Sequence, residues 1–170
     1  SYATLKPGDS DLNIKCSLDF DSPLIPPAPF KFNMSNRSFS RELSKARTFG
    51  FLQDIQYLIS KGLARGGSLE NAVVIDNYRV LNPEGLRYPD EFVRHKALDA
   101  IGDLSLLGMK VRGKLTLHRS GHALNSALAQ KIIASPDAWV ISESKSLKEL
   151  NGTSEENSAF QVLGHMSTTA

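Results

Sequence analysis

The chain has 170 residues, a formal net charge of +2 and 41% hydrophobic residues. This length fits one domain with an ordinary core, or one compact domain with a tail. The small net charge gives no strong case for nucleic acid or anionic membrane as a partner, and no apolar run approaches the roughly 20 residues of a transmembrane helix.

The ends and the single cysteine give further expectations. The chain starts Ser1-Tyr2-Ala3 without a methionine, so we expect a piece of a longer chain or a processed product. Lys6 and the three residues after it interrupt the start, and we expect no signal peptide. Cys16 cannot form an intrachain disulfide, which suits a reducing compartment and favours a cytoplasmic protein.

The first third of the chain alternates short polar and apolar stretches. In chain order we predict strands at 2–6 and 12–20 as a hairpin-like pair, a loop with four prolines at 22–29, a strand at 30–34, a short helix at 38–46 and an extended stretch at 47–49. Proline cannot donate a backbone hydrogen bond, which is why the third of these segments is a loop.

The remainder contains two stronger helical patterns. We predict a helix at 52–60 ending at Gly62, a strand at 72–75, a turn at 82–85, the strongest helix from an Asp90 N-cap to Gly108, a strand at 111–118, a helix at 122–134 capped by Ser120, and a strand at 139–142. This mixture favours an α+β sheet with helices on one face. Residues 145–170 have little to bury and predict a disordered tail.

Three polar side chains share one face of the strongest helix. His95, Asp99 and Asp103 are four residues apart in turn, so they span only about 80° of the helix. Zinc accepts histidine nitrogen and carboxylate oxygen, and His95 with Asp99 would supply two of about three protein ligands. The alternative is an ordinary solvated helix face. Gly102 lies on the polar side and predicts a close approach to the backbone.

A second histidine stands at the start of the next helix, in Arg119-Ser120-Gly121-His122. Backbone N–H groups at a helix N-terminus suit an anion or developing negative charge. The helix dipole disfavours a protonated His122, whereas a carboxylate such as Asp103 would favour it. The sequence leaves that balance open, and the plain alternative is a histidine that belongs to the cap.

Four strings together carry a family resemblance: FVRHKALDAIGDLSLLG, RSGHALNSALAQKI, ARTFGFLQDIQYL and GLARGGSLENAVV. They resemble the UDP-3-O-acyl-N-acetylglucosamine deacetylases, zinc amidases of lipid A biosynthesis in Gram-negative bacteria. The resemblance implies that residues 1–144 form the C-terminal domain of a two-domain enzyme. It further implies a two-layer sandwich whose mixed sheet has about five strands and two main helices on one face, with a small βαβ insert at about 50–76.

The resemblance also implies roles for individual residues. His95 and Asp99 match two zinc ligands, and Asp103 and His122 match a pair that stabilises the oxyanion or protonates the leaving amine. Lys96 matches a substrate-contacting lysine. The remaining matches concern the substrate: Thr48 beside the tetrahedral intermediate, Phe49 and Gly67 along the sugar and acyl approach, Leu52, Ile55, Ala64, Ser68 and Val74 along the acyl passage, and Arg119 facing the diphosphate.

One family motif has no match in this chain. The family's third zinc ligand and its catalytic glutamate stand in a His-x-x-Glu-His motif of the N-terminal domain, and the spare histidines here, His118 and His165, have no such context. We therefore predict a chain that is inactive alone and needs the N-terminal domain as its partner, or a separately expressed N-terminal half. The alternative is a truncated, non-catalytic module that binds the UDP-sugar or acyl group.

Overall fold

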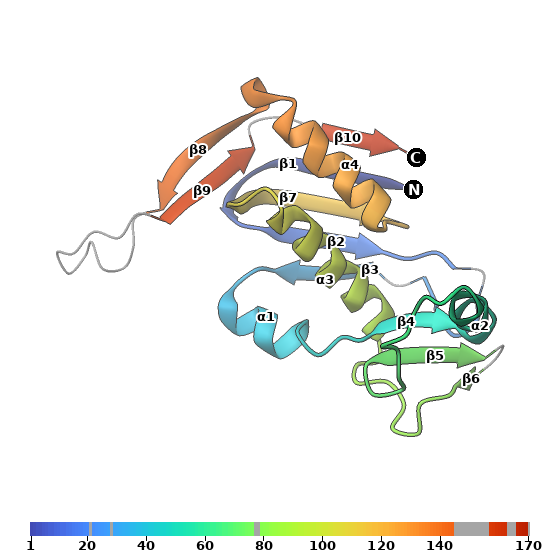
Figure 1. Cartoon of the computed structure of the whole chain (residues 1–170). Coiled ribbons are helices and arrows are strands. Elements are labelled where there is room, and N and C mark those ends of the chain that lie inside the picture. The colour runs from blue at the N-terminus through green and yellow to red at the C-terminus, as the bar shows by residue number, and fades with distance from the viewer. Residues whose placement is uncertain (21, 28, 77–78, 145–156, 163–165, 170) are drawn as a thin grey trace.

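A computed structural model describes residues 1–20, 22–27, 29–76, 79–144, 157–162 and 166–169 (Figure 1). The main sheet has the order β10-β1-β7-β2-β3, with β9 joining β7 and β8 joining β9, so seven strands of the described residues belong to it. Its strands are β1 (Tyr2–Asp11), β2 (Asn13–Ser17), β3 (Pro29–Asn33), β7 (Lys110–His118), β8 (Trp139–Ser144), β9 (Asn157–Val162) and β10 (Met166–Thr169).

The helices cover one face of this sheet, which confirms the predicted α+β class (Figure 1). They are α3 (Glu91–Ser105) and α4 (His122–Ile133), whereas α1 (Asn36–Glu42) lies at the β3 edge of the sheet, and a 3-10 turn follows α4 at Pro136–Ala138. The buried side of α3 presents Val93, Ala97 and Ala100 to the core, where Leu115 and Leu117 of β7 are also buried. Within the described residues, no helix is long and apolar enough to cross a membrane.

The predicted hairpin of the first two strands is wrong. β7 lies between β1 and β2, antiparallel to the first and parallel to the second, so that Tyr2 and Ser17 both pair with His118. The physical reason is the length of β1, which continues through Pro7 to Asp11. Only Leu12 then separates the two strands, and a hairpin needs a loop of about two residues.

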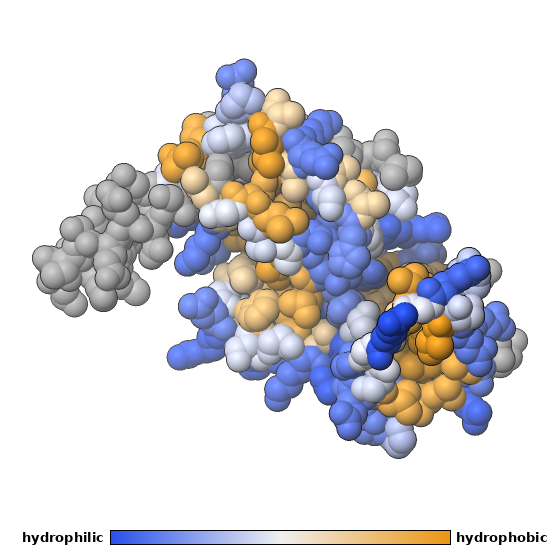
Figure 2. Space-filling model, viewed as in Figure 1, coloured by the Kyte–Doolittle hydropathy of each residue, from blue (hydrophilic) through white to orange (hydrophobic). Residues whose placement is uncertain are grey.

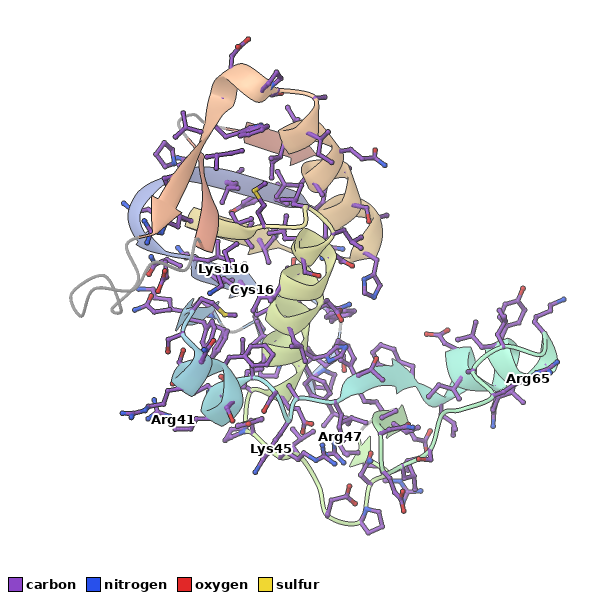
Figure 3. The ribbon with its side chains drawn as sticks, turned by 60° about the vertical axis from the view of Figure 1, so that its left-hand side comes forward. Cys16, Arg41, Lys45, Arg47, Arg65 and Lys110 are labelled. Atoms are coloured by element: carbon purple, nitrogen blue, oxygen red, sulfur yellow. The ribbon has the colours of Figure 1, made fainter. Side chains whose placement is uncertain are left out.

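The predicted βαβ insert is present as a unit with its own sheet. It consists of β4 (Thr48–Phe51), α2 (Leu52–Ser60) and β5 (Ala72–Asp76), followed by β6 (Arg79–Val80). β4 and β5 are parallel, as the crossover through α2 requires. Gly62 has a φ of +74°, which confirms it at the end of α2. Figure 3 shows the insert reaching away from the main sheet, with Arg65 at its far end.

Other expectations are met in part. Two segments of the expected disordered tail are the strands β9 and β10, whereas its residues 145–156, 163–165 and 170 lie outside the described residues, where disorder stays a prediction. Asp90 is the N-cap of α3, but its carboxylate contacts Arg94 Nε at 2.5 Å and makes no capping hydrogen bond. A Cβ on Gly102 would meet no described atom within 4 Å, so the predicted close approach is not found there.

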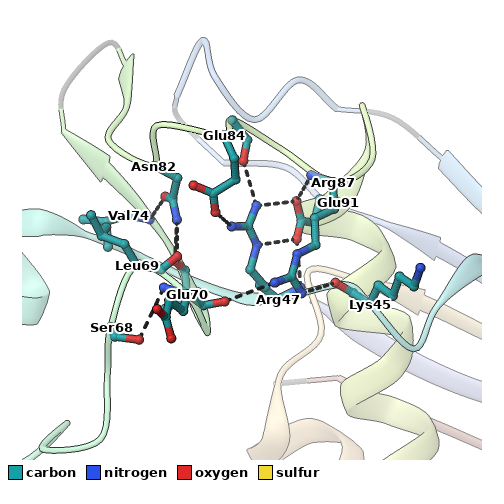
Figure 4. Close-up of polar contacts among 12 residues, drawn as sticks. Lys45, Arg47, Ser68, Leu69, Glu70, Val74, Asn82, Glu84, Arg87 and Glu91 are labelled. Carbon is teal, nitrogen blue, oxygen red and sulfur yellow. Dashed lines mark hydrogen bonds and ion pairs between the residues drawn. The ribbon is translucent and has the colours of Figure 1, made fainter.

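A buried ion pair joins the start of α3 to the segment before β4 (Figure 4). The side chain of Glu91 is 0% exposed and that of Arg47 is 2% exposed. Glu91 Oε1 accepts hydrogen bonds from Arg47 Nε at 3.0 Å and from the Arg47 backbone N–H at 2.9 Å. Glu91 therefore neutralises a buried cation.

The same network holds the base of the insert. Arg47 also contacts Glu84 and donates to the Gly85 carbonyl at 2.7 Å. The backbone N–H of Arg87 donates to Glu91 Oε2 at 2.6 Å, and the Arg87 guanidinium donates to the Glu70 carbonyl at 3.1 Å. These contacts tie the loop before α3 and the last residues of the insert to one buried carboxylate (Figure 4).

Arg47→Met removes the cation and leaves Glu91 charged in the core. We expect a loss of about 3–5 kcal/mol in the free energy of unfolding, because a buried charge without its partner is costly. Urea denaturation of the purified chain measures this. The matched control is Arg119→Met, whose guanidinium is 54% exposed and 3.5 Å from Asp19, and it should change stability by less than about 0.5 kcal/mol. Equal losses in both variants would contradict this role of Arg47.

Glu91 also predicts the acid sensitivity of the fold. Burial raises the pKa of Glu91, but its hydrogen bonds from Arg47 and Arg87 outweigh burial and hold that pKa below its ordinary value. Its stabilisation is therefore present above the unfolded-state pKa of about 4.3 and is lost as pH falls through the lower folded value. Glu91→Gln should flatten the fall in unfolding free energy below about pH 5. Parallel pH curves for the two proteins would refute this.

Candidate active site

The helix α3 places His95, Asp99 and Asp103 on one face, as the sequence predicted. Their side chains are 15%, 10% and 16% exposed, so each is partly covered and still reaches the surface. The opposite face of the helix is apolar and packs on the sheet. The i, i+4 spacing stacks the three side chains along one face of the helix, and the packing of the apolar face on the sheet turns this face outward.

His95 is oriented from both ends of its ring. Its Nδ1 lies 3.2 Å from the carbonyl oxygen of Ala46, and its Nε2 lies 3.1 Å from Asp99 Oδ1. A backbone carbonyl at Nδ1 favours the tautomer with hydrogen on that nitrogen and leaves Nε2 free to accept a metal. The ring of Phe49 packs edge-on against His95, with centroids 6.3 Å apart.

Asp99 is held ionised by two neighbours. Lys96 Nζ lies 3.1 Å from Asp99 Oδ2, and His95 occupies the other carboxylate oxygen. Burial raises the pKa of Asp99, but the hydrogen bonds and charges of His95 and Lys96 outweigh it and lower the pKa below its usual value. The Lys96 ammonium also lies 5.6 Å from the centre of the Phe49 ring. An anionic oxygen thus lies 3.1 Å from an imidazole nitrogen.

The second histidine is fixed by a chain of polar groups on α3 and α4. Asp103 Oδ2 lies 3.0 Å from His122 Nδ1 and accepts a hydrogen bond from Asn125 Nδ2 at 2.8 Å. Ser120 Oγ in turn donates to Asn125 Oδ1, which sets the direction of the amide. Gly121, rather than the predicted Ser120, is the N-cap of α4, because the Ser120 hydroxyl is engaged with Asn125.

The two histidines converge on Asp99. His122 Nε2 lies 4.0 Å from Asp99 Oδ1, the same oxygen that contacts His95. His122 is 70% exposed, so this side of the site is open. The structure therefore brings together five of the predicted site side chains on α3 and α4, with Phe49 beside them: His95, Lys96, Asp99, Asp103 and His122.

The donor set fits two of the ligands of a zinc ion. Ligand atoms at about 2.0–2.2 Å from a tetrahedral zinc lie about 3.3 Å from each other, and His95 Nε2 and Asp99 Oδ1 are 3.1 Å apart. Within the part of the chain that the structure describes, no group of three histidine, cysteine, aspartate or glutamate side chains could hold a metal ion. A complete zinc site would therefore require a ligand from elsewhere.

The other predicted residues lie at varying distances from this cluster. Thr48 is exposed at the start of β4, between Ala46 and Phe49, which both contact His95. Arg119 has a φ of +50° and lies three residues before His122. The predicted acyl-passage residues belong to the insert, where Val74 is buried, Leu52 and Ile55 are half-buried, and Ala64, Gly67 and Ser68 are exposed in the loop after α2.

Sequence reasoning missed the supports of the site. The Ala46 carbonyl and the Arg47–Glu91 pair carry no local pattern. Asn125 stands three residues after His122, on the turn of α4 that faces α3, and a buried asparagine at that spacing was the available signal. Cys16 is buried in the sheet, and burial raises its pKa to about 12.

Comparison with known proteins identifies the family. The family model for UDP-3-O-acyl N-acetylglycosamine deacetylase matches residues 1–134. The chain belongs to this family. It is 52%, 55% and 47% identical to UDP-3-O-acyl-N-acetylglucosamine deacetylases of Myxococcus xanthus, Anaeromyxobacter sp. and Haemophilus ducreyi, over 139, 134 and 140 residues.

These alignments cover 82%, 79% and 81% of this chain but only 44%, 44% and 46% of the three deacetylases. The predicted resemblance is therefore confirmed, and the chain spans less than half the length of the deacetylases it matches. This extent is consistent with one domain of a two-domain family, and its position as the C-terminal domain stays a prediction.

Asn125→Ala tests the polar chain behind His122. It leaves the Ser120 hydroxyl and the Asp103 carboxylate short of a partner, and we expect a loss of about 1–3 kcal/mol in the free energy of unfolding. In an Asp103→Ala background the loss should shrink by at least about 0.5 kcal/mol, because Asn125 acts partly through Asp103. Urea unfolding of the four proteins of this cycle gives the coupling. Additive losses would show that the two side chains are independent.

Proposed function

We propose that this chain carries one half of the active site of a zinc-dependent deacetylase, which removes the N-acetyl group of UDP-3-O-acyl-N-acetylglucosamine in lipid A biosynthesis. The observation that carries the proposal is the convergence of His95 and His122 on Asp99 Oδ1, at 3.1 and 4.0 Å. The family membership supplies the reaction class. Hydrolysis breaks the acetamide C–N bond, and water supplies the oxygen of the acetate that leaves.

His95 and Asp99 would hold the zinc ion in this chain. When bound there, zinc would polarise the amide carbonyl and lower the pKa of a water molecule. The contribution of the chain is to hold an imidazole nitrogen next to an ionised carboxylate. The Ala46 carbonyl orients the imidazole, and Lys96 stabilises the carboxylate.

His122 and Asp103 would handle protons and charge. Asp103 accepts the hydrogen of His122 Nδ1, so the other nitrogen, Nε2, faces the His95–Asp99 pair. From there a protonated Nε2 can donate to the oxygen that becomes negative during attack, and then to the leaving nitrogen. Asn125 keeps the Asp103 carboxylate in place for this role.

Substrate contacts would come from the same edge of the domain. Thr48 and Lys96 flank the cluster with groups that can donate to the substrate near the reacting carbonyl, and Phe49 offers an aromatic surface. Arg119, with a half-exposed guanidinium, suits the diphosphate. Leu52, Ile55 and Val74 would line the acyl passage, with Ala64, Gly67 and Ser68 at its loop.

The third zinc ligand and the general base would come from the N-terminal half. The family places both in a His-x-x-Glu-His motif that this sequence does not contain. His118 is not placed to replace that ligand: its neighbour Leu117 is buried in the core, so His118 lies on the other face of β7, beside Ser17 and Tyr2. The open side of the cluster at His122 is where the missing groups would enter.

Reconstitution tests the proposal. The purified chain with zinc and UDP-3-O-acyl-N-acetylglucosamine should show no substantial turnover, because the base and one ligand are missing. Adding the N-terminal half of a family member should restore acetate release. Asp99→Ala in the chain should abolish that gain and weaken zinc binding measured by competition with a chelating dye. His118→Ala is the matched control and should retain both.

The outcomes distinguish the two readings of the sequence. Turnover by the chain alone at the rate of a two-domain enzyme would overturn the claim of a half site. Failure to gain turnover with the N-terminal half, together with binding of the UDP-sugar to the chain, would support the alternative of a non-catalytic binding module.

A further inference from the structure

The far end of the insert is apolar and exposed. Tyr57, Ile59 and Leu63 are 63%, 58% and 56% exposed, and Leu58 is 38% exposed. Figure 2 shows apolar residues gathered over the insert, at the lower right of the molecule, with hydrophilic residues around them. No residue of α2 among those described is fully buried. We call Tyr57, Leu58, Ile59 and Leu63 the insert tip.

The charge at the insert tip has one sign. Residues 55–69 contain Lys61 and Arg65 and no aspartate or glutamate. The Lys61 ammonium lies 5.6 Å from the centre of the Tyr57 ring, and Arg65 Nε donates to the Gly62 carbonyl at 2.8 Å. The flanking acids are Asp54, in the first turn of α2, and Glu70, whose carbonyl accepts a hydrogen bond from Arg87. Figure 3 places Arg65 at the end most distant from the main sheet.

The direction of these side chains limits what can cover them. Tyr57, Leu58 and Ile59 are consecutive on a helix, so their directions differ by about 100° from one to the next. A flat protein surface buries one face of a helix, with apolar residues three and four apart. The apolar side chains of this turn point in three directions, and Leu63 lies beyond them. Covering all of them requires a partner that encloses the end of the insert.

We propose that the insert tip docks on the surface of an anionic phospholipid bilayer. Tyr57, Leu58, Ile59 and Leu63 enter the interfacial layer, and Lys61 and Arg65 contact the lipid phosphates. Lipid encloses an inserted apolar end on all sides, and aromatic residues and cations are enriched at this depth. The small net charge of the chain predicted no attraction to anionic membranes, but that prediction averages over the whole surface, and the charged residues within 55–69 are Lys61 and Arg65.

This site is distinct from the helix and strand residues of the proposed acyl passage, and Leu63 and Arg65 flank the loop residue Ala64 of that passage. Leu52 and Ile55 of α2 are half-buried, with Ile55 facing Gly50 of β4, and Val74 of β5 is buried, whereas Tyr57 is 63% exposed. The N-terminal half of the enzyme is the competing occupant. Its own expected position is the open side of the α3 cluster, at His122.

Vesicle flotation with the full chain tests the proposal, without zinc or substrate, so its outcome is independent of the deacetylase assignment. Vesicles of phosphatidylcholine with about 30 mol% phosphatidylglycerol should carry the chain upward, and pure phosphatidylcholine should carry about tenfold less. Tyr57→Ser/Ile59→Ser/Leu63→Ser should reduce binding about tenfold. The matched control is Leu106→Ser/Ile133→Ser, at apolar positions that are 78% and 63% exposed elsewhere, and it should bind as wild type.

A second variant keeps the test decisive if the triple serine variant does not fold. Lys61→Gln/Arg65→Gln retains every apolar side chain and should bind anionic vesicles about tenfold less at low salt. Equal flotation with neutral and anionic vesicles, or equal losses in the Leu106/Ile133 control, would overturn the proposal. A third outcome would also overturn it: the chain does not bind vesicles, and addition of the N-terminal half protects the insert tip from protease.

Discussion

The carboxylate of Glu91 lies in the core at the first turn of α3, and Arg47, 44 residues earlier, compensates its charge from the segment before β4. Neither group can move away without leaving the other as an unpaired buried charge. This constraint holds the segment before β4 against the helix. It thereby places the Ala46 carbonyl at His95 and the Phe49 ring beside Lys96. The face of α3 that carries His95 and Asp99 is therefore positioned by a network that contains no proposed zinc ligand.

The opposite support comes from α4. Asn125 holds the Asp103 carboxylate, which contacts one ring nitrogen of His122, so the other nitrogen is directed toward Asp99. The cluster is thus ordered by two buried polar systems, and its remaining side is open at His122. A site built in this way agrees with a chain that spans less than half the length of its relatives. The insert extends from the same segment, because β4 begins directly after Arg47.

Local periodicity was sufficient to predict what lies on one element. The fourfold spacing of His95, Asp99 and Asp103 fixed their common face, and the pattern of 52–60 predicted α2 with its observed bounds. Contacts between distant segments were not predictable in this way. The hairpin was wrong because β7, about a hundred residues later, pairs with both strands, and the Arg47–Glu91 pair was not predicted because the two residues are 44 apart in sequence. The exposure of the insert tip was likewise not predictable, because it depends on which distant segments pack against α2.

The central claim is that the chain supplies two zinc ligands and needs a third from elsewhere. X-ray absorption spectroscopy of bound zinc measures this most directly, on the chain alone and with an N-terminal half of the family. The account predicts one imidazole nitrogen and one carboxylate from the chain, with the remaining positions taken by water, and one further imidazole when the second half is added. Two or more imidazole ligands in the chain alone would contradict it.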